Sequence, residues 1–222
     1  MSDIFVKLLC HNIEAFPQPK PDKNEGGDCF ACAFLAALRF LYPEKSFTFE
    51  EIEQVFWVTH QADHINKGVP YTCLNNTWGT YPHVFKQAVE RFGLDGFSHR
   101  FHFEGPPLNI EREFYAWNRC CSQYKNYWDA LQKIIASGGV CYTSINLDGV
   151  GPWSNGRWTD PDHMVLFDGV RERRETYANG GGMHHREIHI VCSARGNSWK
   201  SVHDLLDLYG AGAWHVLERL HE

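Results

Sequence analysis

Residues 28–43 read DCFACAFLAALRFLYP, and this stretch decides the fold of the 222-residue chain. Its apolar side chains recur at spacings of three and four, which predicts a helix over about residues 29–41. Asp28 is a suitable N-cap, and a proline stops the pattern at its far end. Cys29 would then lie at a helix N-terminus, where unpaired N–H groups and the helix dipole favour a thiolate. The alternative is that Cys29 and Cys32 are small core residues.

A second segment supplies a candidate base. Residues 162–170 read DHMVLFDGV and place His163 at the start of a predicted apolar strand. The separation 163 − 29 = 134 residues lies within the ~130–150 typical of the Cys and His of papain-type peptidases. An imidazole can accept the thiol proton and hold it as imidazolium. The alternative is a strand-end histidine bonded to a backbone carbonyl.

These segments resemble a known family. Cys29-Phe30-Ala31 is similar to the Cys-aromatic-Ala that opens the nucleophile helix of papain-like cysteine peptidases, and the Ala-rich helix resembles the bacterial, bacteriocin-processing branch. Residues 162–170 resemble the catalytic His strand, and residues 138–145 resemble the strand before it. The resemblance implies an α+β, papain-like two-lobed fold in a single domain, 1–222. Its helical lobe would span about 1–137 and its antiparallel, β-rich lobe about 138–222.

The chain departs from the family pattern at the oxyanion donor. Papain-like enzymes carry a Gln about six residues before the nucleophile, and Lys23 stands at that place here. Asn24 or Gln18 could supply the amide N–H if the loop is arranged differently, so we assign the oxyanion role to these two residues.

A second departure concerns the residue that orients the histidine. Asn197-Ser198-Trp199 repeats the papain Asn-Ser-Trp sequence, but about four residues later after the preceding strand than expected. We expect Asn197 to be the third catalytic residue. The position at the end of the strand itself would select Cys192 or Ser193 instead, and without an orienting residue the site would be a dyad or degenerate.

The loop before His163 is a candidate substrate wall. Residues 149–158 hold Trp153 and Trp158 among several glycines and run into the candidate base. We expect these two tryptophans to bind substrate. The alternative is a surface loop whose tryptophans cover the core.

Composition narrows the class of protein. The net charge of −6 argues against a nucleic-acid-binding role, and no apolar run approaches the ~20 residues of a membrane span. The N-terminus lacks the pattern of a signal peptide, so we expect reduced cysteines and a cytoplasmic location, or secretion by a route that needs no signal peptide.

Two other roles are open to the cysteines and histidines. Cys29 and Cys32 form a Cys-x-x-Cys, but no thioredoxin-like unit precedes it. A zinc site would need further ligands, for which the candidates are His184, His185, His189 and Cys192. The predicted strand through these residues gives them no convergent geometry, so we expect neither a metal nor a cofactor.

The remaining elements follow from periodicity and punctuation. The N-terminal tail, with three prolines, should be extended, and Thr48-x-x-Glu51 is a capping box for a second helix through about residue 58. Further helices are expected from Pro82 to just before Gly93, at 110–137 and after Ser201, and strands at 97–103, 140–146, 163–170, 187–193 and 213–219.

The sequence as a whole predicts a cysteine peptidase or amidohydrolase. Cys29 rather than Cys32 would attack a peptide or amide carbonyl and form an acyl-enzyme, with a peptide or protein as substrate. An acyltransferase, a Gln deamidase of effector type or a catalytically inactive papain-like binding domain are the alternatives. The sequence does not determine the oligomeric state.

Overall fold

The computed structural model describes residues 3–17, 29–55, 90–103, 121–145, 153–154, 157–158, 163–177, 181–207 and 213–220. This part of the chain combines helices with an antiparallel sheet, which confirms the α+β class. None of its helices is long and apolar enough to cross a membrane.

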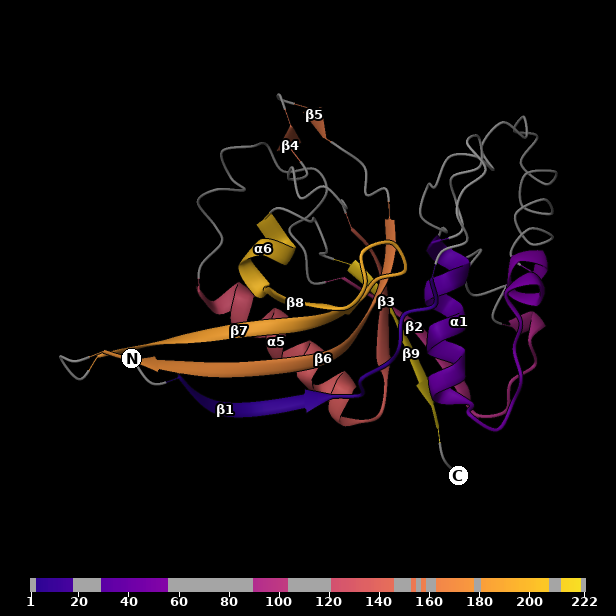
Figure 1. The fold of residues 1–222 in the computed structure, drawn as a ribbon, viewed down its shortest axis with the longest axis horizontal. Coiled ribbons are helices and arrows are strands. Elements are labelled where there is room, and N and C mark those ends of the chain that lie inside the picture. The colour runs from indigo at the N-terminus through magenta and orange to yellow at the C-terminus, as the bar shows by residue number, and fades with distance from the viewer. Residues whose placement is uncertain are drawn as a thin grey trace.

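A seven-stranded sheet organises the described residues (Figure 1). The strand order is β2-β9-β3-β6-β7-β8, with β1 pairing separately along β6. Its strands are β1 Asp3–Cys10, β2 Phe97–Phe103, β3 Val140–Ile145, β6 His163–Thr176, β7 Gly182–Val191, β8 Ser198–Ser201 and β9 Ala213–Arg219. A separate two-stranded ribbon joins β4 Trp153–Ser154 to β5 Arg157–Trp158.

Helix α1, Cys29–Leu41, covers one face of this sheet. Ten of its thirteen residues are buried. Most of them are alanines or large apolar side chains, which pack against the strands. Its cluster includes Tyr142 of β3, Leu166 of β6 and Leu217 of β9. Figure 1 shows α1 beside β3 and β9, with the long β6–β7 hairpin extending away from it.

Helix α5, Cys121–Ala136, covers the opposite face. Strand alternation divides the sheet residues between the two helices. In β6, Met164 and Leu166 belong to the α1 cluster, whereas Val165 and Phe167 belong to the α5 cluster. The short helix α6, Val202–Asp207, packs on the α5 side through Val202 and Leu205.

Strand β6 is the hub of the sheet. Its first half, His163–Phe167, pairs with β3, and its second half, Gly169–Glu175, pairs with β1. Strand β7 pairs along the other side, from Leu166 to Thr176. The pairing with β7 shifts between Phe167 and Gly169, so Asp168 is the extra residue of a β-bulge. The bulge aims the buried Asp168 carboxylate at residues that follow β1.

The structure confirms several sequence predictions. Helix α1 has the expected bounds, and the capping box is closed by hydrogen bonds from Thr48 N–H to Glu51 Oε2 (2.9 Å) and from Glu51 N–H to Thr48 Oγ1 (3.2 Å). The expected strands at 97–103 and 213–219 have the predicted bounds, and β3 ends one residue earlier than predicted. The helix expected between Pro82 and Gly93 lies mostly outside the described residues.

Other elements differ from the expectation. Strand β1 and strand β8 were not predicted, and β6 and β7 are longer than expected because cross-strand ion pairs support them beyond the apolar core. The sheet is also not confined to residues 138–222, since it takes β1 and β2 from the first half of the chain. Helix α5 starts at Cys121; residues 110–120, where a helix was also expected, lie outside the described part.

Candidate functional site

Cys29 is the first residue of α1 and is almost fully buried, with 3% of its surface exposed. It belongs to the same apolar cluster as Met164 at the start of β6 and Val191 at the end of β7. Its place at a helix N-terminus is the one predicted, while its N-cap, Asp28, lies outside the described residues. Cys29 and Cys32 carry thiols rather than a disulfide.

His163 is the first residue of β6, and only 5% of it is exposed. Its Nε2 atom lies 3.3 Å from Sγ of Cys192, the residue directly after β7. The same sulfur accepts the backbone N–H of Arg195 at 3.3 Å. Since His163 pairs with Ile145 of β3, alternation places its side chain on the face of Val165 and Cys192. Cys29 belongs to the apolar cluster on the other face of the sheet, which also contains Met164, the residue after His163 in β6.

Asn197 has a different contact in the structure. Its side-chain amide donates a hydrogen bond to the Ile13 carbonyl at 2.8 Å and so ties the segment after β1 to the turn before β8. The residue in contact with His163 is Cys192, which the sequence offered as the alternative at the end of the strand. The register in which β6 pairs with β7 is what brings Cys192 to this position. The orienting role of Asn197 stays a prediction.

The remaining predicted site residues have little described structure. Asn24 and Gln18 lie outside the described residues. Trp153 pairs with Trp158 across the β4–β5 ribbon. This pairing describes the backbone at two points of the predicted substrate loop and leaves the roles of the two side chains untested. Their roles in oxyanion and substrate binding also stay predictions.

The four candidate zinc ligands, His184, His185, His189 and Cys192, do not point at a common position. His184 Nδ1 lies 3.2 Å from Glu172, and His185 Nε2 lies 3.1 Å from Glu175. Cys192 contacts His163, as described above. His189, by contrast, faces two partners that no sequence motif links to it.

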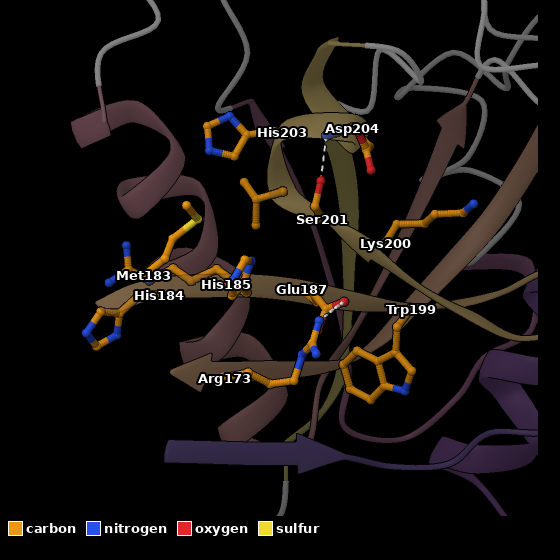
Figure 2. Close-up of a pocket in the computed structure, with 12 residues that line it drawn as sticks. Arg173, Met183, His184, His185, Glu187, Trp199, Lys200, Ser201, His203 and Asp204 are labelled. Atoms are coloured by element: carbon orange, nitrogen blue, oxygen red, sulfur yellow. Dashed lines mark hydrogen bonds and ion pairs between the residues drawn. The ribbon is translucent and has the colours of Figure 1, made fainter. Parts of the chain in front are cut away.

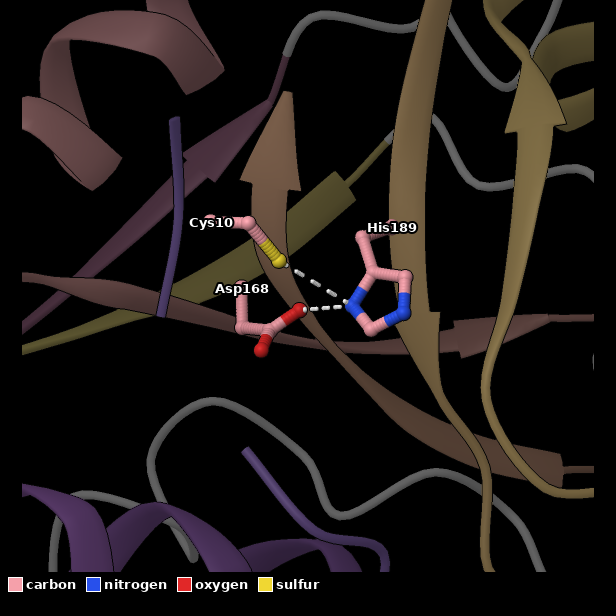
Figure 3. Close-up of side chains that lie close together, drawn as sticks. All are labelled: Cys10, Asp168 and His189. Carbon is pink, nitrogen blue, oxygen red and sulfur yellow. Dashed lines mark hydrogen bonds and ion pairs between the residues drawn. The ribbon is translucent and has the colours of Figure 1, made fainter. Parts of the chain in front are cut away.

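These partners are Cys10 and Asp168, which with His189 form a compact cluster on three adjacent strands (Figure 3). His189 Nδ1 lies 2.6 Å from Asp168 Oδ1 and 3.5 Å from Cys10 Sγ. Asp168 is fully buried, and its other oxygen accepts the Ile13 N–H at 2.8 Å. No local motif marks this cluster, because it depends on pairing Cys10 and His189 with the same residue, Gly169.

The cluster does not have the geometry of a catalytic triad. In such a triad the nucleophile and the orienting carboxylate use different ring nitrogens, whereas here the thiol and the carboxylate both face Nδ1 of His189. Burial raises the pKa of the Cys10 thiol; a backbone hydrogen bond with Asn12 partly offsets this, and the Asp168 charge adds to it. A nucleophile needs the opposite shift.

A pocket of about 550 Å³ lies elsewhere, between the distal part of the β6–β7 hairpin, β8 and α6 (Figure 2). Its lining is rich in cationic and histidine side chains, among them Arg173, Lys200 and His203. Part of this charge is balanced, since Arg171 and Arg173 both contact Glu187, at 2.6 and 2.8 Å. The pocket contains none of the predicted catalytic residues.

Comparison with known proteins gives no assignment. No protein-family model matches the chain, and no curated protein matches it. The papain-like resemblance therefore depends on the residues quoted above.

Proposed function

We propose that the chain is a papain-like cysteine hydrolase that cleaves a peptide or amide bond through an acyl-enzyme. The observation that carries the proposal is the packing of α1, which begins with Cys29, against β6, which begins with the buried imidazole of His163. Met164, which follows His163 in β6, and Val191, the last residue of β7, lie in the same apolar cluster as Cys29. The papain-like resemblance implies a helix-terminal thiol and a strand-initial histidine on two elements that pack together, and α1 and β6 are two such elements.

The proposed reaction uses the two nitrogens of His163 differently. Nε2 faces Cys192, so Nδ1 would accept the proton of the Cys29 thiol. The ring would reach Cys29 around the end of β6, where the two faces of the sheet meet. The thiolate attacks the carbonyl carbon, the imidazolium returns its proton to the departing amine, and water then hydrolyses the thioester with His163 as base.

The oxyanion and substrate assignments follow the same proposal. The Cys29 N–H and an amide from Asn24 or Gln18 would hold the negative oxygen. Trp153 and Trp158 would flank the peptide. Transfer of the acyl group to an amine, or deamidation of Gln, would use the same residues with a different acceptor or substrate. A peptide or protein partner and a cytoplasmic location fit this chemistry.

One observation favours a second candidate, a catalytically inactive domain that binds a partner. One contact of His163 Nε2 is with a thiol, and a thiol orients an imidazolium less strongly than an amide or carboxylate oxygen does. In that case the imidazole and Cys192 would be a buried structural pair.

Alkylation by iodoacetamide separates the two candidates. At a pH of about 6 an ordinary thiol of pKa ~8.5 is only about 0.3% thiolate. We expect Cys29 to be alkylated at least tenfold faster than Cys32, with the site identified by mass spectrometry of peptides. Cys29→Ala should remove the fast phase, and Cys32→Ala should retain it. Equal, slow alkylation of both thiols in the native protein would support the inactive domain.

A further inference from the structure

Three donor atoms from three adjacent strands meet around Gly169. Cys10 ends β1, Asp168 forms the bulge of β6, and His189 lies in β7. Their Sγ, carboxylate oxygen and Nδ1 atoms all lie within 4.8 Å of one another. Figure 3 shows the thiol and the carboxylate pointing at the same edge of the imidazole ring. One small ion could contact all three.

We propose that Cys10, Asp168 and His189 bind a divalent transition-metal ion of the Zn²⁺ class. Thiolate, imidazole and carboxylate are the ligand types that Zn²⁺ takes, whereas Mg²⁺ and Ca²⁺ prefer oxygen alone. The site is separate from the proposed Cys29–His163 pair and shares no residue with it.

The donor distances suit this ion. With bonds of about 2.3 Å to sulfur and about 2.05 Å to nitrogen, a tetrahedral angle separates the two donors by about 3.5 Å. The Cys10 Sγ–His189 Nδ1 distance is 3.5 Å. Nitrogen and oxygen donors would lie about 3.4 Å apart, so the 2.6 Å hydrogen bond between His189 and Asp168 must open by about 0.8 Å. Binding the ion would therefore replace this hydrogen bond and move the His189 ring and the Asp168 carboxylate apart.

The absence of a side chain at Gly169 lets Cys10 and His189 approach each other. A Cβ atom on Gly169 would lie 2.7 Å from Cys10 Sγ and 3.0 Å from His189 Cβ, so a larger residue would push the flanking ligands apart. The Asp168 carboxylate is held at its second oxygen by the Ile13 N–H, and Asn197 fixes the Ile13 carbonyl. Trp199 packs on the His189 ring, with centroids 4.9 Å apart. Such outer contacts fix the orientation of metal ligands.

Charge favours a cation at this point. Asp168 is buried, and a thiolate at Cys10 would repel it, whereas a divalent ion would neutralise both. Loading the site releases the thiol proton to solvent, and the proton that Nδ1 of His189 shares with Asp168 moves to Nε2 of the ring so that Nδ1 can bind the ion. Three protein ligands leave a fourth position for water or another donor.

The test uses Co²⁺ as a spectroscopic probe in the full-length Cys29→Ala protein, which removes the proposed catalytic thiol. After chelator treatment, we expect one Co²⁺ per chain, a sulfur-to-cobalt charge-transfer band in the near ultraviolet, and displacement by Zn²⁺. Adding Cys10→Ser should abolish that band and weaken Zn²⁺ binding by more than about a hundredfold, beyond the 10–100-fold effect of an outer-shell change. Adding Cys141→Ala, a buried thiol on the α5 side, should leave the band in place.

Protection of thiols in the unmodified protein tests the same site without relying on a folded variant. Stoichiometric Zn²⁺ should slow alkylation of Cys10 at least tenfold and leave Cys192 unchanged. The proposal is overturned if the protein binds no Co²⁺, if the charge-transfer band survives Cys10→Ser, or if Zn²⁺ protects other thiols but not Cys10. None of these results depends on hydrolase activity, so failure of the proposed function would not imitate failure of the metal site.

Discussion

The Nε2 atom of His163 lies 3.3 Å from the Sγ atom of Cys192. In the proposed papain-like site, Cys192 would occupy the place of the oxygen-bearing residue that orients the imidazole. Cys192→Asn should supply that oxygen at nearly the same volume, and a hydrogen bond to a charged ring contributes about 1.5–3 kcal/mol. We expect the alkylation rate of Cys29 near pH 6 to rise about tenfold or more. Cys192→Ala is the matched control and should not raise it; an unchanged rate in Cys192→Asn would argue against the catalytic pair.

The pairing of Cys29 with His163 can be tested by cross-linking. The agent 1,3-dibromoacetone loses two bromides as it joins a thiolate sulfur to a ring nitrogen. If Cys29 is the nucleophile, peptide mapping should find it bridged to His163, and Cys29→Ala should yield no such product. Because Cys192 is the described neighbour of His163, a bridge from Cys192 in place of Cys29 would move the reactive thiol to the end of β7.

Asp168 should be one of the most sensitive positions for stability. Its carboxylate is fully buried and contacts both the Ile13 N–H and His189. Asp168→Ala leaves two buried polar groups without this partner, which should cost about 2–5 kcal/mol. Chemical denaturation measures the loss. Glu14→Ala removes an exposed carboxylate from the same segment and should cost less than about 0.5 kcal/mol; equal losses would show that Asp168 does not pin this segment.

Glu187 gives the β6–β7 hairpin a defined dependence on pH. Burial alone would raise its pKa, but hydrogen bonds and charges from Arg171 and Arg173 outweigh burial and hold the pKa below its usual value. The stabilisation is therefore present above the unfolded pKa of about 4.3 and is lost as pH falls through the lower folded pKa. The stability difference between wild type and Glu187→Gln should shrink below about pH 4.3 in denaturation series; a constant difference would contradict this assignment.

Local sequence signals predicted the elements whose stability is mainly local. The α1 helix has a strong apolar period and a terminal proline, and the capping box at Thr48 needs only residues within one turn. Strand β8 reads SWKS, a short polar segment whose strand conformation comes from pairing with β7. Nothing in its own four residues indicates that pairing.

The site was harder to predict than the elements, because it depends on strand register. The choice between Asn197 and Cys192 turns on where β7 ends relative to β6, and a bulge at Asp168 shifts that register. The Cys10 cluster joins residues that lie 158 and 179 positions away from Cys10 in the sequence. Their meeting requires both pairings of β6 at once, which periodicity does not reveal.

The contact around Gly169 predicts an energetic coupling between two substitutions. A Cβ at residue 169 would lie 2.7 Å from Cys10 Sγ, so Gly169→Ala should destabilise the fold by about 1–3 kcal/mol through overpacking. Cys10→Ala removes that sulfur, although its own Cβ, at 3.0 Å, remains close. The double variant should therefore recover part of the loss, about 0.5–1.5 kcal/mol relative to additivity, in a double-mutant cycle by denaturant unfolding. Strictly additive losses would mean that β1 does not approach Gly169 this closely.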